Sequence, residues 1–325
     1  MISLSGMWSW AKWIADRTVA ASGLDVAHGA GAALHFFVYD LLKVVVLVAA
    51  VSFVMALIRG AIPHDKLRAK LEGRGGRVLG YPAAALFGAL TPFCSCSSVP
   101  IFLGFVQARF PIGVAFAFLI TSPLVNEIAV AIMAATFGWK LALGYAASGI
   151  VLGIVGGLVL TAMHAERWLV AGASGAADDD DEPLPHGVRA RLVDAAQTSG
   201  RILRNIAPWL VGALVLGAAL HGFVPENFFQ SLFAGRGAWT VPLAALAGLP
   251  LYVSANATVP LLEAFVAKGV PLGTALAFLL SAVGVSLPEL VMLRGVMTVR
   301  LLVLFSVVVL IGTTIVGWIF NAVAS

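Results

Sequence analysis

The chain has 325 residues, of which 60% are hydrophobic and 11% are charged, and its formal net charge is +4. Soluble proteins carry about 25% charged residues, so this composition excludes an ordinary soluble enzyme, a disordered protein and a collagen-like fibre. It indicates an all-α polytopic membrane protein, because a membrane-crossing helix takes roughly 20 apolar residues. The basic residues lie in short stretches between apolar segments and form no continuous basic face. The expected partner is therefore the lipid bilayer, and nucleic-acid binding is not expected.

The N-terminal segment, residues 1–32, contains Trp8, Trp10, Trp13 and Arg17. Tryptophan side chains favour the layer between the lipid tails and water. We therefore expect an amphipathic N-terminal helix that lies in the membrane interface. A frayed tail is the alternative.

Apolar segments follow along the chain, and most are long enough to form a membrane helix. They cover residues 33–58, 79–108, 112–136, 141–163, 202–223, 240–267, 270–293 and 301–321. These segments form two groups, which predicts a first transmembrane repeat at 33–163 and a second at 201–325. The stretch between them, 164–200, contains the acidic run 178–182. Like charges beside prolines are typical of a solvated, disordered linker.

An internal repeat relates the two groups at a constant offset of 160 residues (271 − 111 = 160). The matching strings are Val99-Pro100 with Val259-Pro260, Pro111-Ile112-Gly113 with Pro271-Leu272-Gly273, and Ala117-Phe118-Leu119 with Ala277-Phe278-Leu279. Glu127 and Glu289 fall in similar places with a two-residue slip. A duplication with interrupted segments at matching positions is the pattern of a secondary transporter.

Charge placement predicts how the repeats are oriented. The loop at 59–77 is rich in Lys and Arg, and arginines flank the linker at 164–200, so both are expected on the cytoplasmic side. Both assignments hold if the Pro-broken segments at 79–108 and 240–267 re-enter the membrane without crossing it. The halves would then be inverted, each with about three full spans and one re-entrant segment. If each broken segment crosses once, the halves are parallel.

The first broken segment contains the string TPFCSCSSVP at residues 91–100. Its prolines prevent a plain helix, and unsatisfied backbone groups are costly in lipid unless they line a cavity or are buried in protein. This segment can be a hydrated pore element, or it can be a tightly hydrogen-bonded packing contact inside the protein. We favour the pore, because the second half repeats the pattern. The expected substrate-binding residues are Cys94, Ser95, Cys96, Ser97, Ser98, Asn256 and Thr258.

The Cys94-x-Cys96 spacing places two soft ligands where both sulfur atoms can face one atom, and thiolates bind thiophilic species. Trivalent arsenic that carries one organic group has two remaining valences, which two cysteines match. Inorganic arsenite prefers three thiolates, and the chain has only these two cysteines. The alternative is that both cysteines are small buried hydrophobic residues.

Two acidic residues, Glu127 and Glu289, lie inside apolar segments. Carboxyl groups in membrane spans usually face a cavity or a partner, and some of them carry protons. We expect Glu127 and Glu289 to couple transport to protons, with a bond to a helix N-terminus as the alternative. The sequence contains no P-loop and no metal-ligand cluster, so no cofactor is expected.

The strings TPFCSCSSVP at 91–100, ANATVP at 255–260 and SLPE at 286–289 resemble the predicted-permease family. Its characterised members include the ArsP-type organoarsenical efflux permeases. The resemblance covers most of residues 35–320, and it implies a multi-pass permease of the bacterial inner membrane. For ArsP-like members it further implies export of trivalent organoarsenicals with cysteines involved in recognition.

Two functions of different classes follow. The first is a secondary transporter, not an enzyme, that exports a small thiophilic solute, with trivalent organoarsenicals as the first candidates. A permease for another small solute or anion is a variant of it. The second is a membrane thiol–disulfide relay, which would need a further redox partner for Cys94 and Cys96. Whether the chain forms a homo-oligomer is left open.

Overall fold

A computed structural model of the chain describes residues 9–22, 29–59, 74–91, 95–107, 110–170, 188–223, 237–250 and 255–324. Every regular element within these ranges is a helix. The first half contains α2 (Ser9–Ser22), α3 (Gly29–Arg59), α5 (Arg74–Leu90), α6 (Ser95–Gln107), α7 (Ile112–Leu124), α8 (Glu127–Phe137), α9 (Trp139–Ala162) and the short η1 (Ala165–Trp168). The second half contains α10 (Val188–Phe223), α12 (Thr240–Gly248), α13 (Ala255–Ala267), α14 (Leu272–Gly284), α15 (Leu287–Leu293) and α16 (Val299–Ala324).

Four helical stretches of the described residues are long and apolar enough to cross a membrane: Phe37–Val54, Trp139–Ala162, Leu272–Leu293 and Val299–Val323. A fifth span results if α7 and α8, which are bent by 49° at their junction, count as one. The chain is therefore an all-α polytopic membrane protein, as the composition predicted. The spans counted this way are fewer than the roughly three full spans expected in each half, and α10 is not among them.

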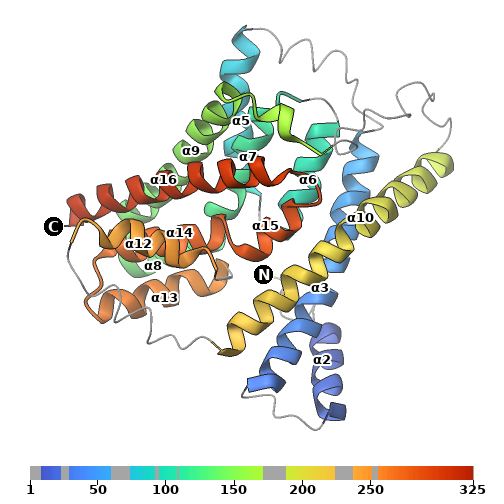
Figure 1. Cartoon of the computed structure of the whole chain (residues 1–325), viewed down its shortest axis with the longest axis horizontal. Coiled ribbons are helices and arrows are strands. Elements are labelled where there is room, and N and C mark those ends of the chain that lie inside the picture. The colour runs from blue at the N-terminus through green and yellow to red at the C-terminus, as the bar shows by residue number, and fades with distance from the viewer. Residues whose placement is uncertain are drawn as a thin grey trace.

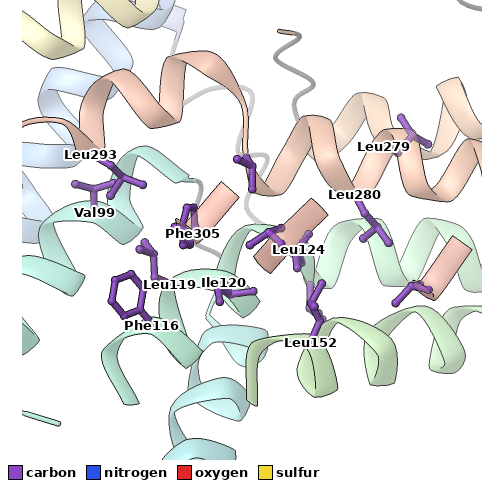
Figure 2. Packing of buried hydrophobic residues seen from close by; sticks show 14 of the residues in the cluster. Val99, Phe116, Leu119, Ile120, Leu124, Leu152, Leu279, Leu280, Leu293 and Phe305 are labelled. Atoms are coloured by element: carbon purple, nitrogen blue, oxygen red, sulfur yellow. The ribbon is translucent and has the colours of Figure 1, made fainter. Parts of the chain in front are cut away.

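The centre of the molecule consists of α7 and α14, which contact each other. Every residue of α7 and nearly every residue of α14 is buried. Each helix alone has 13 residues, or about 20 Å at 1.5 Å per residue. A bilayer core of about 30 Å is therefore reached only by α14 together with α15 and by α7 together with α8. Helices α5 and α9 pack on α7, and α12 and α16 pack on α14. Figure 2 shows Leu124 of α7 near Leu280 of α14 and Leu152 of α9.

Aromatic packing around α7 recurs around α14 at positions 160 residues later (265 − 105 = 160). Phe105 and Phe118 form a T-shaped pair with ring centroids 5.3 Å apart and planes at 78°. Phe265 and Phe278 form the equivalent pair at 5.3 Å and 80°. The two central helices are thus anchored by the preceding helices, α6 and α13, in the same way.

Close helix approaches recur at the same offset. Gly157 of α9 lies directly against the carbonyl of Gly113 in α7. In the second half, a Cβ atom on Gly317 of α16 would lie 2.7 Å from the carbonyl of Gly273 in α14. Small residues let helix backbones approach this closely in membranes. Gly149, Gly153 and Gly157, which are four residues apart along α9, lie against α7 or the residue that follows it, so this spacing serves the contact between α9 and α7.

Helices α9 and α16 pack against each other in opposite directions. A Cβ atom on Gly144, near the start of α9, would lie 3.3 Å from the ring of Phe320, near the end of α16. Further along α9, a Cβ atom on Gly156 would lie 3.6 Å from Val308, which is earlier in α16. As residue numbers increase along α9, the contacting residue numbers in α16 decrease, so the two helices are antiparallel.

The segment that follows α9 pairs with the segment that precedes α16. Leu169 and Met297 form an antiparallel bridge, in which the amide of Val170 donates to the carbonyl of Val296 at 3.0 Å. The hydroxyl of Thr298 also donates to the carbonyl of Trp168, at 2.7 Å. The end of α9 and the start of α16 therefore lie at the same end of the molecule.

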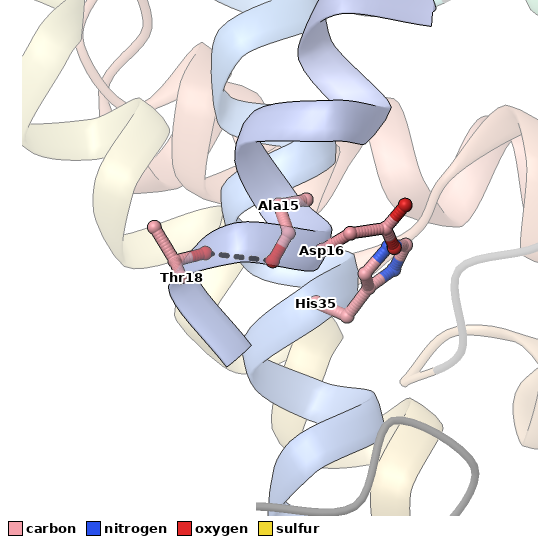
Figure 3. A network of polar contacts seen from close by, with 4 residues as sticks. All are labelled: Ala15, Asp16, Thr18 and His35. Carbon is pink, nitrogen blue, oxygen red and sulfur yellow. Dashed lines mark hydrogen bonds and ion pairs between the residues drawn. The ribbon is translucent and has the colours of Figure 1, made fainter. Parts of the chain in front are cut away.

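Helices α2, α3 and α10 lie together at one side of the molecule (Figure 1). On α2, the side chains of Ala11, Ala15 and Val19 are fully buried, and α2 packs on α3. The ring of His35 on α3 lies 2.9 Å from a carboxylate oxygen of Asp16 on α2 (Figure 3). These contacts fix the N-terminal helix along the start of α3.

The outer face of α2 carries Trp10 and Trp13, which are 41% and 57% exposed. The guanidinium group of Arg17 lies 4.6 Å from the ring centre of Trp13. The position of this helix in the membrane interface stays a prediction, and exposed tryptophans would suit it. Trp8 lies outside the described residues.

The expected linker at 164–200 is shorter than the sequence suggested. Its first residues form η1 and the bridge to Met297, and α10 already begins at Val188. Charged residues at the start of α10 made this part resemble a loop, but the hydroxyl of Ser199 donates to the carbonyl of Ala49 in α3 at 2.9 Å. Packing on α3 therefore extends the helix into polar sequence. The acidic run 178–182 lies outside the described residues.

Candidate functional site

The segment with the cysteine motif leads into α6, which begins at Ser95. Pro92 and Cys94 lie outside the described residues, and for Cys96 the structure gives only its place in the first turn of α6. Just before the motif, α5 ends at Leu90, and the hydroxyl of Thr91 donates back to the carbonyl of Phe87 at 2.6 Å. The motif at 91–100 therefore begins directly after α5, and its residues from Ser95 onward form the start of α6, with Pro100 inside the helix.

A buried pair of hydroxyl groups follows the cysteine motif. The side-chain oxygens of Ser98 in α6 and Ser122 in α7 are 2.8 Å apart, and neither side chain is exposed. Val99 and Phe102, which follow Ser98, are buried among apolar residues. A buried hydroxyl group needs a hydrogen-bond partner, so this pair fixes the N-terminal end of α6 against α7.

The second broken segment enters the core in the same way. Helix α13 begins at Ala255, and Thr258 and Val259 are buried like Ser98 and Val99, which lie 160 positions earlier (258 − 98 = 160). The side chain of Asn256 lies outside the described residues. Two segments far apart in the sequence thus each place a hydroxyl group inside the protein.

Both central helices break before their apolar segments end. Helix α7 ends at Leu124, and α8 starts at Glu127 after two non-helical residues; α14 ends at Gly284, and α15 starts at Leu287. The last turns are closed alike, because Val125 and Val285 each donate an amide hydrogen bond of 2.9 Å to the carbonyl four residues earlier. Such breaks are tolerated in a membrane protein where other groups satisfy the backbone.

Two contacts satisfy backbone groups at these breaks. The hydroxyl of Tyr145 in α9 donates to the carbonyl of Leu124 at 2.6 Å. In the second half, the amide of Leu287 donates to the carbonyl of Leu249 at 2.8 Å. The breaks are therefore built into the packing of the neighbouring helices. Sequence reasoning did not single out Tyr145, although it is a polar residue in an uncharged apolar segment.

The two acidic residues differ in position and environment. Glu127 is the first residue of α8 and is exposed, whereas Glu289 is the third residue of α15 and is 1% exposed. Because the helix ends keep the offset of 160 residues, Glu289 corresponds to Ala129 and not to Glu127 (289 − 160 = 129). Glu127 and Glu289, which the sequence comparison paired by allowing a shift of two residues, are therefore not structurally equivalent.

The helices that bear the polar residues contact each other across the two halves. Helix α6 of the first half packs on α15 of the second, and α13 of the second half packs on α8 of the first. Figure 2 shows Val99 of α6 beside Leu293 of α15. The first polar segment thus lies next to the helix that carries Glu289, and the second lies next to the helix that begins with Glu127.

Further hydroxyl groups are buried near these breaks. The side-chain oxygens of Thr121 and Ser286 are inaccessible and form no hydrogen bond within the described part of the chain. Thr121 lies against Gly153 of α9, whereas Ser286 stands directly before α15. Among the described residues, no group of three or more His, Cys, Asp or Glu side chains could hold a metal ion.

Residues 30–322 match the sequence model of a family described as a predicted permease. The chain belongs to this permease family. The UPF0718 protein YraQ of Escherichia coli strain K12 is 27% identical to it over 264 residues, which cover 81% of this chain and 73% of YraQ. The UPF0718 protein MJ0584 of Methanocaldococcus jannaschii is 20% identical over 300 residues, which cover 75% of this chain and 82% of MJ0584. No solved structure matches the chain.

Membership in the permease family agrees with the fold. A permease acts on small molecules within the bilayer, and the apolar helices of this chain suit a multi-pass membrane protein. The family also favours a transporter over an enzyme. The buried polar groups at the helix breaks are therefore candidates for a transport site.

Proposed function

We propose that this permease exports a small thiophilic solute across a bacterial inner membrane, with trivalent organoarsenicals as the first candidates. The observation that carries the proposal is the position of the cysteine motif. Its two cysteines are the only ones in the chain, and they directly precede the buried hydroxyl pair of Ser98 and Ser122. Two cysteines in the sequence that leads to a buried hydroxyl pair suit a small polar solute with affinity for sulfur.

The chemistry of methylarsenite fits two thiols. Its arsenic atom carries one methyl group and two hydroxyl groups. Condensation with the thiols of Cys94 and Cys96 would form two As–S bonds, break two As–O bonds and release two water molecules, with no change of oxidation state. Arsenite has a third hydroxyl group for which the chain supplies no third thiol. We therefore expect methylarsenite to be a better substrate than arsenite.

The proposed transport path runs between two inverted halves. Contacts that recur at an offset of 160 residues support a repeat, among them the pairs Phe105–Phe118 and Phe265–Phe278. The antiparallel packing of α9 and α16 supports inversion, because these helices occupy equivalent places in the two halves. Inverted repeats with interrupted helices place the substrate near the middle of the membrane in many secondary transporters.

Export assays with cysteine variants test the proposal. Everted membrane vesicles that contain the permease should accumulate methylarsenite when a proton gradient is imposed. Cys94→Ser and Cys96→Ser should each lower this uptake at least about tenfold, because loss of one As–S bond removes more than 1.4 kcal/mol of binding. Ser148→Ala is the matched control, since its hydroxyl bonds only to the carbonyl of Tyr145 within α9 among the described residues.

The same vesicles separate the alternatives. Arsenite, pentavalent methylarsenate and small inorganic anions are tested beside methylarsenite. Full methylarsenite uptake by the Cys94→Ser/Cys96→Ser double variant would exclude recognition by thiols. Uptake of an anion but not of methylarsenite would indicate a permease for another solute. Mass spectrometry that finds a cycling Cys94–Cys96 disulfide would instead favour the thiol–disulfide relay.

A further inference from the structure

The residues at the start of α15 have the sequence of a capping box, but the serine side chain does not form the capping hydrogen bond. Ser286 is the N-cap residue, and Glu289 stands three positions later, as in the S-x-x-E pattern. In a closed box, the serine hydroxyl accepts a hydrogen bond from the backbone of the first turn. Here the Ser286 side chain makes no cap bond, and its buried hydroxyl has no hydrogen bond within the described residues. The hydroxyl is therefore available to a ligand.

Glu289 lies on the buried face of α15. It shares this face with Met292 and Leu293, three and four positions later, and all three are at most 2% exposed. Leu293 lies beside Val99 of α6 (Figure 2), and α6 contacts α15. The carboxyl group of Glu289 is thus on the face that α15 turns toward the helix of the cysteine motif.

The first half of the chain supplies the polar residues of α6 and α7 near α15. The hydroxyl of Ser98 next to Val99 bonds to Ser122 in the last turn of α7. That turn also reaches the second half, since a Cβ atom on Gly284 would lie 2.7 Å from Leu124. Gly284 directly precedes the break that leads to Ser286. The start of α6, the last turn of α7 and the segment that leads into α15 are therefore linked by contacts between their neighbouring residues, where the two halves meet.

Within the described part of the chain, the helices that pack on α15 carry few ionisable residues. Helix α10 packs on α15, and a Cβ atom on its Gly212 would lie 3.7 Å from Val291. Between Arg204 and His221, α10 has no ionisable residue, and only Arg201 and Arg204 precede this stretch closely. On α6 the one ionisable residue is Cys96. Beyond α15, Arg294 donates to the carbonyl of Met297 at 3.2 Å.

We propose that Glu289 is the proton-binding group of the transport site and that this site is built across the halves, from α6 of one and α15 of the other. The inference rests on the proposed function for the identity of the solute. Ser286 supplies a hydroxyl group to the same site. Glu127 is not part of it, because it is exposed at the start of α8. Solute binding then displaces the proton from Glu289, which couples export to proton entry.

Proton release on binding tests this assignment. Purified permease in weakly buffered detergent at pH 7, with a pH-indicator dye, is mixed with methylarsenite. Condensation with two protonated thiols yields water and no net proton, so a released proton comes from another group. We expect release from the wild type and from Glu127→Gln, and none from Glu289→Gln. Equal release from Glu289→Gln and the wild type would overturn the proposal.

The glutamine substitution separates a proton-binding role from a structural one. Glutamine can take the place of glutamate in a capping box, so Glu289→Gln should melt like the wild type. Its methylarsenite affinity should be lower than that of the wild type and independent of pH, because the amide resembles the protonated carboxyl group that solute binding has to displace. Ser286→Ala should weaken methylarsenite binding by about fivefold, the loss of one hydrogen bond, with proton release preserved at saturation. Unchanged binding by Ser286→Ala would remove Ser286 from the site.

A measurement without solute tests the assignment of Glu289 independently of the proposal that methylarsenite is the substrate. Infrared difference spectra between acidic and alkaline pH should show the carbonyl band of a buried protonated carboxyl group in the wild type and in Glu127→Gln. The band should be missing from Glu289→Gln. If the wild type fails to bind methylarsenite but the band behaves in this way, the substrate proposal fails and the assignment of Glu289 stands. A band that survives in Glu289→Gln overturns the assignment.

Discussion

At the scale of single residues, the permease buries hydroxyl groups where its helices begin and end. Ser98 and Ser122 pair with each other at 2.8 Å, and Tyr145 donates to the carbonyl that is freed at the end of α7. A buried polar group left without its partner costs about 1–3 kcal/mol. These contacts therefore select the broken helix over a continuous one.

The Ser98–Ser122 contact predicts a measurable coupling. Ser98→Ala and Ser122→Ala should each destabilise the protein, because each leaves the other buried hydroxyl without this partner. The double variant should lose less than the sum of the singles, with a coupling of about 0.5–1.5 kcal/mol. Unfolding of the four proteins in detergent measures this double-mutant cycle. Strict additivity would show that the two hydroxyl groups do not interact.

At the scale of elements, glycine residues set the distances between the outer and central helices. Gly157 of α9 and Gly317 of α16 each lie against a backbone carbonyl of a central helix. A methyl group cannot fit there unless the helices move apart. The same close approach in both halves holds α7 and α14 in the centre, where each follows the helix of a Pro-broken segment, α6 or α13.

Alanine substitutions at these glycines test the close approaches. Gly157→Ala and Gly317→Ala should each destabilise the protein by about 1–3 kcal/mol through overpacking. Gly200→Ala is the matched control, because nothing lies within 4 Å of a Cβ atom at that position of α10. It should be neutral or stabilise the helix by up to about 1 kcal/mol. Thermal unfolding in detergent compares the three, and equal effects would refute the packing argument.

At the scale of the whole molecule, the arrangement of the two halves decides which loops share a side of the membrane. The bridge between Leu169 and Met297 joins the end of α9 to the start of α16. Both helices are long enough to cross, so they cross in opposite directions. Because they occupy equivalent places 160 residues apart, the equivalent loops of the two halves are expected on opposite sides.

Cysteine labelling in intact cells checks this topology. In a Cys94→Ser/Cys96→Ser background, Ser231→Cys should react with a membrane-impermeant maleimide. The segment 222–239 around it contains a single basic residue, Arg236, and is therefore expected outside. Lys66→Cys, in the basic loop of the first half, should react only after the cells are opened. Labelling of both positions from the same side would indicate parallel halves.

The sequence by itself determined the fold class and the family. Apolar segments of membrane length, the proline-broken segments at 79–108 and 240–267, and the strings at 91–100, 255–260 and 286–289 are local features. They predict helices, breaks and a permease without knowledge of how the helices pack. The position of the helix breaks was not predicted, because the residues 125–126 and 285–286 lie within apolar sequence that is compatible with an unbroken span.

Only the tertiary structure decided which polar residues come together. In the sequence, Glu127 and Glu289 are alike, since both are acidic residues in apolar segments. Packing separates them, because α15 turns Glu289 into the core against α6, whereas α8 leaves Glu127 exposed. Contacts between α6 and α15 join residues nearly 200 positions apart in the chain, and such contacts depend on side-chain fit between distant segments, which no local pattern encodes.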